Sequence, residues 1–274
     1  MGSRRPFYSF PTLPMGAWHP FTGRGVAAFA SASNTRTLLL LLLAAASVGG
    51  VFVWSLSNAW FPVIDRGIQA LPPEAAIRSA KLLWGDARAR RLAENATLDW
   101  VVRPKPPGPN DLLGQSSDLR IELRGQSLRF QGALGHLEFP YPATWDVPLG
   151  RIPALAAWNS WRPYLSVASG IAVAIVLLAA WTLMASAYCI PAWLVAHVLG
   201  KRPTLAMAWR LSAASLVMGA VVGAAGIAAY ASGIIRIPGL LASQVIHVPI
   251  PWVWLLWGIL SLDLGGRSSR RSSR

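Results

Sequence analysis

The feature that most constrains this chain is a set of four long stretches that contain no Asp, Glu, Lys or Arg. They cover residues 37–64, 163–200, 211–234 and 237–262. A helix needs about 20 apolar residues to cross the hydrocarbon core of a bilayer. Hydrophobic residues make up 54% of the chain and charged residues 13%, about half the charged share of an ordinary soluble domain. The sequence therefore predicts a multi-pass membrane protein that is mainly α-helical.

We expect four transmembrane helices, at residues 37–57, 163–188, 211–234 and 235–262. The first is predicted to be an uncleaved anchor, because its apolar centre begins too far into the chain for an ordinary signal peptide. The second stretch exceeds one crossing, so residues 189–210 are predicted to form a cytoplasmic or interfacial connector. Pro249 and Pro251 interrupt the fourth stretch. These prolines leave two alternatives open: one kinked helix, or a surface segment followed by a short helix.

Residues 58–162, between the first two spans, have a different composition. They hold every acidic residue except Asp263 and are predicted to form a small water-soluble, β-rich domain. In residues 118–124 every second residue is apolar, which is typical of a half-buried strand. Gly125, Gly132 and Gly135 mark turns between such runs,. We therefore expect a small antiparallel sheet. Residues 73–92 fit either a helix or strands.

The orientation of the spans is predicted from the cations that flank them. Cytoplasmic loops of membrane proteins carry an excess of Lys and Arg. Such residues lie in the N-terminal segment 1–36, in the connector 189–210 and in the tail 263–274, with Asp263 as the only acidic residue there. Both termini are therefore expected in the cytoplasm, and residues 58–162 outside. The cations expected to fix topology or contact lipid are Arg4, Arg5, Arg24, Arg36, Lys201, Arg202, Arg210, Arg267, Arg270, Arg271 and Arg274.

The net charge of +14 does not indicate nucleic acid binding, because the charges are arranged around apolar spans. The basic tail can instead contact anionic lipids, since each Arg gains about 1 kcal/mol near such a surface. In the third span, Gly219, Gly223 and Gly226 are spaced so that another helix can approach closely. We expect that helix to come from the same chain more readily than from a second copy.

No pattern of residues predicts a cofactor, a metal ion or a catalytic centre. The histidines are scattered and Cys189 is the only cysteine, so no multi-Cys or His-x-x-x-His ligand set exists. Asp118 and Glu122 share one face of the predicted strand, but Arg120 and Arg124 share that face too. A solvated strand with alternating charges is therefore favoured over acid–base catalysis.

Local patterns, together with the order of the chain's parts, carry a resemblance to a known family. These patterns are Leu71-Pro72 followed by Ala76–Trp84, Arg91-Leu92-Ala93-Glu94-Asn95, Leu134-Gly135 with Pro140-Tyr141-Pro142, and Gly200-Lys201-Arg202-Pro203 leading into Ala208-Trp209-Arg210-Leu211. Over most of its length the chain resembles bacterial Yip-related multi-pass membrane proteins of unknown function. The resemblance implies an integral inner-membrane protein and supplies no catalytic residues. It favours strands for Ala76–Trp84, with Ala80 standing where a turn glycine is expected.

The leading functional hypothesis is a non-enzymatic interaction or scaffold component of the bacterial inner membrane, with an envelope or membrane protein as a possible partner. The alternative is a transporter or lipid-handling subunit, for which Gln244, His247 and Pro249 are the residues to test. The third hypothesis is a membrane-bound enzyme acting on envelope substrates. Its candidate carboxylates are Glu94, Asp99, Asp118 and Glu122.

Overall fold

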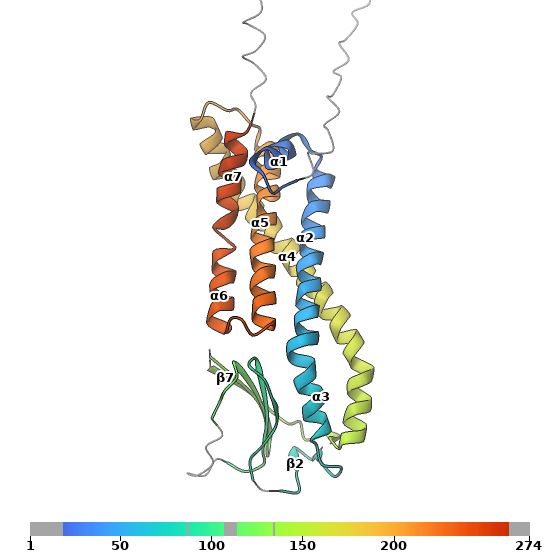
Figure 1. The fold of residues 1–274 in the computed structure, drawn as a ribbon. Coiled ribbons are helices and arrows are strands. Elements are labelled where there is room, and N and C mark those ends of the chain that lie inside the picture. The colour runs from blue at the N-terminus through green and yellow to red at the C-terminus, as the bar shows by residue number, and fades with distance from the viewer. Residues whose placement is uncertain (1–18, 87, 107–113, 134, 263–274) are drawn as a thin grey trace, which may run out of the picture. The chain divides into compact units, whose positions relative to one another are not determined.

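The computed structural model describes residues 19–86, 88–106, 114–133 and 135–262. Four of its helices are long and apolar enough to cross a membrane, and a β-sheet region lies between the first and second of them in the sequence (Figure 1). The chain divides into two compact units. The first unit contains residues up to Ala44, Leu178–Gly219 and residues from Val248 on; the second unit contains Ala45–Leu177 and Ala220–His247.

The first candidate span extends well beyond its predicted end at residue 57. It is a continuous helical run made of α2 (Asn34–Ser55), the π-helical stretch η3 (Leu56–Trp60) and α3 (Phe61–Gln69). The prediction that the β-rich domain begins at residue 58 was wrong. Pro62 directly follows the π-helical stretch, and the wider π turn, a local adjustment of the kind that accommodates proline inside apolar helices, lets the helix continue.

The second candidate span, α4, is also longer than predicted. It runs over Arg151–Val198 as one helix, so it includes the end of the predicted β-rich segment and the start of the predicted connector. Pro153 lies in its first turn, where proline is tolerated, while Pro163 and Pro191 lie inside it. Apolar helices accommodate such prolines because local adjustments and neighbouring groups satisfy the freed carbonyls. The sequence boundary at Pro163 was therefore misplaced.

The last two candidate spans lie close to their predicted positions. α5 covers Leu205–Ala231, beginning six residues before the predicted residue 211, because Thr204 accepts a hydrogen bond from the Met207 N–H and starts the helix there,. The fourth stretch forms two helices, α6 (Ile237–Ile246) and α7 (Ile250–Leu260). The interruption covers residues 247–249 and so includes Pro249, while Pro251 lies in the first turn of α7.

In the first unit, a short N-terminal helix packs into the apolar core. α1 (Gly23–Ala28) is followed by the 3-10 turn η2 (Phe29–Ser31). Thr22 caps α1 by accepting a hydrogen bond from the Gly25 N–H,. The core joins these elements to α4, α5 and α7, and its buried members are Val26, Phe29, Ala30, Ala32, Ala192, Ala196, Leu211, Ala214, Leu255 and Ile259.

In the second unit, two sheets form the β-rich region (Figure 1). The three-stranded sheet has the order β2-β1-β8, and the five-stranded sheet has the order β3-β4-β5-β6-β7. The strands are β1 (Ala76–Arg78), β2 (Lys81–Leu83), β3 (Arg90–Glu94), β4 (Leu98–Arg103), β5 (Leu119–Arg124), β6 (Ser127–Gly132), β7 (Gly135–Pro140) and β8 (Asp146–Pro148). Residues 73–92 therefore contain strands, and the alternative prediction of a helix was wrong.

One pairing departs from the predicted antiparallel sheet. β4 and β5 are parallel, with Leu98 beside Leu119 and Arg103 beside Arg124. A parallel pair needs a crossover connection rather than a tight turn, and here the chain between Arg103 and Leu119 provides it. The predicted turns at Gly125 and at Gly132 with Gly135 are confirmed, since they join β5 to β6 and β6 to β7.

The apolar face of the five-stranded sheet packs against helices of the same unit. Buried side chains from the end of α3, from β1 to β5 and from the loop after β7 form this core: Ile68, Leu71, Ile77, Leu82, Leu92, Val102, Leu123 and Tyr141. Burial raises the pKa of the Tyr141 hydroxyl above its ordinary range. Trp100 lies against Gly67 of α3, where an added Cβ would come within 2.1 Å of the indole ring. Only glycine permits this contact.

The β1–β2 turn contains two residues in the left-handed region, Ser79 (φ 48°) and Ala80 (φ 62°). A two-residue hairpin turn with positive φ at both positions favours glycine. Ala80 is thus strained at the position where the family resemblance expects a turn glycine.

We predict that Ala80→Gly raises the free energy of unfolding of the β-rich region by up to about 1 kcal/mol, because removal of the left-handed strain outweighs the added chain entropy. The control Ala93→Gly, in strand β3, should lower it. Thermal unfolding of the two purified variants measures both. A lower melting temperature for Ala80→Gly would contradict the assignment of strain to this turn.

Candidate ligand-binding site

The parallel register of β4 and β5 collects charged residues on one face of the five-stranded sheet. It places Asp99 beside Arg120 and Arg103 beside Arg124. Because side chains alternate between the faces of a strand, residues 99, 101 and 103 share a face with residues 120, 122 and 124. This face, which we call the charged face, also receives Arg91 from β3 and Glu138 from β7 through their ion pairs.

Asp99 is the centre of the first ion-pair cluster on the charged face. Its carboxylate is fully buried and accepts hydrogen bonds from Nε and a terminal nitrogen of Arg120, at 2.9 and 2.7 Å. Arg91 Nε lies 3.1 Å from its other oxygen. Arg91 and Arg120 both donate to the carbonyl of Gly114, at 2.7 and 2.6 Å. The end of the β4–β5 crossover is therefore fastened over this part of the sheet.

Glu122 is the centre of the second cluster. Its side chain is 3% exposed and lies between two guanidinium groups, with Arg103 Nε at 3.1 Å and Arg124 Nε at 3.2 Å. Arg124 also pairs with Glu138 at 3.6 Å. The pKa of the Glu138 carboxyl is lowered, first because it accepts a hydrogen bond from Ser127 and then because Arg124 and Arg129 are near. The charged form of the Glu138 carboxyl is therefore stabilised.

The charged strand is buried, which contradicts the prediction of a solvated strand. Arg120 and Glu122 are among the buried residues of the chain. The sequence of β5 alone shows alternating charges, but opposite charges that neutralise them also come from β4 and β7. A charge can be buried when it is paired and hydrogen-bonded in this way.

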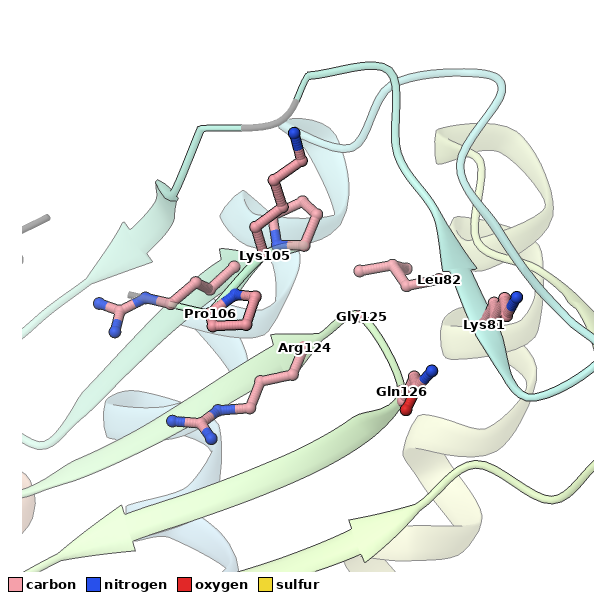
Figure 2. A pocket seen from close by; sticks show the side chains of 9 residues that line it. Lys81, Leu82, Lys105, Pro106, Arg124, Gly125 and Gln126 are labelled. Atoms are coloured by element: carbon pink, nitrogen blue, oxygen red, sulfur yellow. The ribbon is translucent and has the colours of Figure 1, made fainter. Parts of the chain in front are cut away.

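At one end of the charged face lies a cavity of about 520 Å³. The end of β4, the β5–β6 turn and strand β2 enclose it. Its lining includes four cations, Lys81, Arg103, Lys105 and Arg124, and no acidic side chain among the described residues. Figure 2 shows Lys105 with Pro106 on one side of the Gly125 turn and Lys81 with Gln126 on the other.

Backbone contacts fix the walls of this cationic cavity. The Leu82 N–H donates to the Gly125 carbonyl at 2.8 Å, which joins β2 to the β5–β6 turn. Gly125 also lies so close to the Pro104 carbonyl that an added Cβ would come within 2.4 Å of the oxygen. The sequence indicated a turn at Gly125, but it gave no signal that the distant Lys81 would lie near it.

The carboxylates that the enzyme hypothesis singled out do not converge on this cavity. Asp99 and Glu122 are held by the arginine pairs above, and Glu94 pairs with Arg91 at 2.9 Å and accepts from Ser116. Asp118 lies outside the strand and accepts a hydrogen bond from the Ile237 N–H at the start of α6. Within the described ranges, no group of three or more His, Cys, Asp or Glu residues could hold a metal ion.

Two of the three predicted packing glycines, Gly223 and Gly226, lie against the neighbouring helix α6 of the same chain. An added Cβ at Gly226 would come within 2.0 Å of the Ser243 hydroxyl in α6. The Gln244 side-chain amide donates to the Gly223 carbonyl at 3.4 Å. The Gln244 backbone carbonyl lies within hydrogen-bonding distance of His247 Nδ1. Gly219 is buried in the first unit. Gln244 and His247, residues of the transporter hypothesis, thus make contacts that hold α6 in place, and Pro249 is the N-cap of α7.

Three of the predicted topology cations also have structural contacts, all in the first unit. Arg210 donates to the Ala30 carbonyl at 2.7 and 3.1 Å and to Asn34 at 3.2 Å. Lys201 donates to the carbonyls of Leu260 and Leu262 at the end of α7. Arg36 lies over the Phe29 ring. Sequence reasoning missed the contacts of Arg210 and Lys201 because their partners, mostly backbone carbonyls, lie far along the chain.

Arg24 and Arg202 complete the described members of the topology set, and both are exposed. The remaining members lie outside the described residues: Arg4, Arg5, Arg267, Arg270, Arg271 and Arg274.

Comparisons with known proteins return no match: no family model, no curated protein and no solved structure is similar to this chain.

We predict that Asp99→Asn lowers the free energy of unfolding by about 3 kcal/mol, because it leaves the buried guanidinium group of Arg120 and the partly exposed one of Arg91 without their full countercharge,. The matched control is Asp146→Asn, which removes a pair with Arg78 whose side chains are 75% and 64% exposed. Asp146→Asn should lower the free energy of unfolding by less than about 1 kcal/mol. Thermal unfolding of the full chain in detergent measures both, and equal melting temperatures for the two variants would contradict the buried network.

The lowered pKa of Glu138 predicts a pH-dependent effect. A carboxyl whose pKa is lower in the folded state stabilises the fold above its ordinary pKa of 4.5, and this contribution is lost as pH falls through the lowered value. Glu138→Gln should therefore reduce the melting temperature at pH 7, and the difference from the unmodified protein should vanish in strongly acidic buffer. A difference that stays constant with pH would contradict the hydrogen bond from Ser127.

Proposed function

We propose that this chain is a multi-pass protein of the bacterial inner membrane, with both termini in the cytoplasm and the β-rich region outside. In this proposal it is a non-enzymatic interaction component whose outward region binds an anionic component of the cell envelope. The four apolar helices and the cations that flank them support the orientation,. Membrane lipids surround the helices, and the envelope component occupies the cationic cavity.

The cationic cavity is the observation that carries this proposal. The cations in its lining have no acidic neighbour among the described lining residues, and Glu122 behind it is already held by two of them. Lys81 and Lys105 therefore give the cavity an excess of positive charge. The alkyl stems of these side chains and Pro104 and Pro106 add apolar surface. Such a site suits an anionic polymer or headgroup that also has an apolar part.

The arrangement of carboxylates supports an interaction role over catalysis. A general acid or base must reach its substrate and change its protonation state. Asp99 and Glu122 are instead buried in pairs with arginines. These pairs serve the fold, because they join β3, β4 and β5 to one another and to the end of the crossover. We therefore expect the ligand to bind at the edge of the charged face rather than among its buried ion pairs.

We predict that the double substitution Lys81→Glu with Lys105→Glu weakens the binding of dextran sulfate to the purified full chain by about tenfold or more at low salt. Each reversed charge changes an attraction of about 1 kcal/mol into a repulsion. The matched control is Arg78→Glu with Arg88→Glu, which changes the net charge equally at exposed positions outside the cavity. Fluorescence anisotropy of labelled dextran sulfate measures all three proteins.

If the two double variants lose affinity equally, the polymer recognises net charge and the proposed site is wrong. If neither loses affinity, the anionic ligand is wrong. A photoreactive residue at Gln126, which lines the cavity, then identifies the natural partner in cells. The same residue at Leu83, an exposed position that does not line the cavity, is the control for that capture.

A further inference from the structure

A second cavity, of about 300 Å³, lies on the opposite, apolar face of the five-stranded sheet. The end of α3, strands β4 and β5 and the first turns of α4 enclose it. Three tryptophans line it, Trp100, Trp158 and Trp161, together with small and aliphatic side chains such as Ala157 and Leu123. No charged side chain is among its described lining residues. Its volume is at the lower end of the range of ligand cavities.

The geometry of the helices keeps this apolar cavity open. Trp100 lies flat against α3 because Gly67 has no side chain. Trp158 is held by its indole N–H, which donates to Asp65 of α3 at 2.6 Å. Ala154 and Ala157 of α4 leave the space between these rings unfilled. An open, wholly apolar space of this kind gains free energy when apolar groups displace water from it.

One face of α4 connects the apolar cavity with the membrane-spanning part of the same helix. Residues three or four apart share a helix face, so Ala157 and Trp161 are aligned with Tyr164, Ile171 and Ile175. The side chains on this face are exposed: Trp161 by 64%, Tyr164 by 70%, Ile171 by 55% and Ile175 by 62%. With 48 residues, α4 is about 72 Å long, more than twice the roughly 30 Å of the hydrocarbon core. The helix thus carries one apolar strip from the bilayer to the cavity.

We propose that the apolar cavity binds an alkyl chain of a lipid drawn from the bilayer leaflet that adjoins the β-rich region. The occupant is a lipid because the strip leads from the cavity into the bilayer. A cation is also in place for the headgroup: Arg162, one turn from Trp158, is 38% exposed while pairing with Asp65. Its guanidinium group can bind a lipid phosphate. This site goes beyond the anionic-ligand function and does not depend on it.

The test uses the full chain in vesicles of phosphatidylethanolamine and phosphatidylglycerol that contain a phosphatidylglycerol with a photoactivatable diazirine at the end of one acyl chain. After irradiation, peptide mass spectrometry locates the crosslinks. We expect crosslinks on residues 154–161. Ala157→Phe fills the cavity and should reduce these crosslinks about tenfold. The matched control Ala156→Phe places the same ring toward a different cavity, which Arg151 and Asn159 line, and should leave them unchanged.

A second variant controls for the case in which Ala157→Phe does not fold. Trp161→Gln changes an exposed residue at the rim, so the fold should persist, and crosslinking should fall several-fold. Crosslinks confined to α4 residues inside the span, or equal yields for the Ala157→Phe and Ala156→Phe proteins, would overturn the proposal. If Ala157→Phe loses the crosslinks but binds dextran sulfate as the unmodified protein does, the two sites are separate. If the unmodified protein fails to bind dextran sulfate but gives the expected crosslinks, only the anionic-ligand proposal is wrong.

Discussion

The second unit depends on the register of one parallel strand pair. When β4 lies beside β5 with Asp99 next to Arg120, one face of the sheet becomes a set of paired charges and the other an apolar surface. A shift of β5 by one residue would turn its side chains to the opposite faces, placing its buried charges on the same face as Trp100 of β4. In this register the two buried carboxylates, Asp99 and Glu122, each pair with arginines, so the ion pairs favour it over the shifted one.

The two cavities are consequences of the same register. Because the strands end together at Arg103 and Arg124, the cationic cavity forms at that edge. The opposite ends of the strands contact the α5–α6 turn, where Arg236 donates to the Ala96 carbonyl and Asp118 accepts from the start of α6. The apolar face meets α3 and α4, whose small residues leave the second cavity open. One sheet thus has a charged and an apolar face, each with a cavity beside it.

Sequence patterns predicted the parts of this chain whose structure depends on local composition. The absence of charge over about 20 residues located all four candidate spans, and alternation with flanking glycines located β5, β6 and β7. Where the structure departs, the cause lies far along the chain. The parallel pairing joins β5 to a strand about 20 residues earlier, and the burial of Glu122 depends on Arg103 and Arg124 together. Helix ends were misplaced at prolines, whose effect depends on their place in a turn.

The central proposal is that the β-rich region faces outward while the cationic connector between α4 and α5 faces the cytoplasm. Its most direct test labels single cysteines in intact cells with a membrane-impermeant maleimide, in a Cys189→Ser background that has no other cysteine. Leu83→Cys lies in exposed strand β2 and Arg202→Cys in the exposed connector. We predict that Leu83→Cys is labelled in intact cells and Arg202→Cys only after the membrane is permeabilised. The reverse pattern would contradict the account.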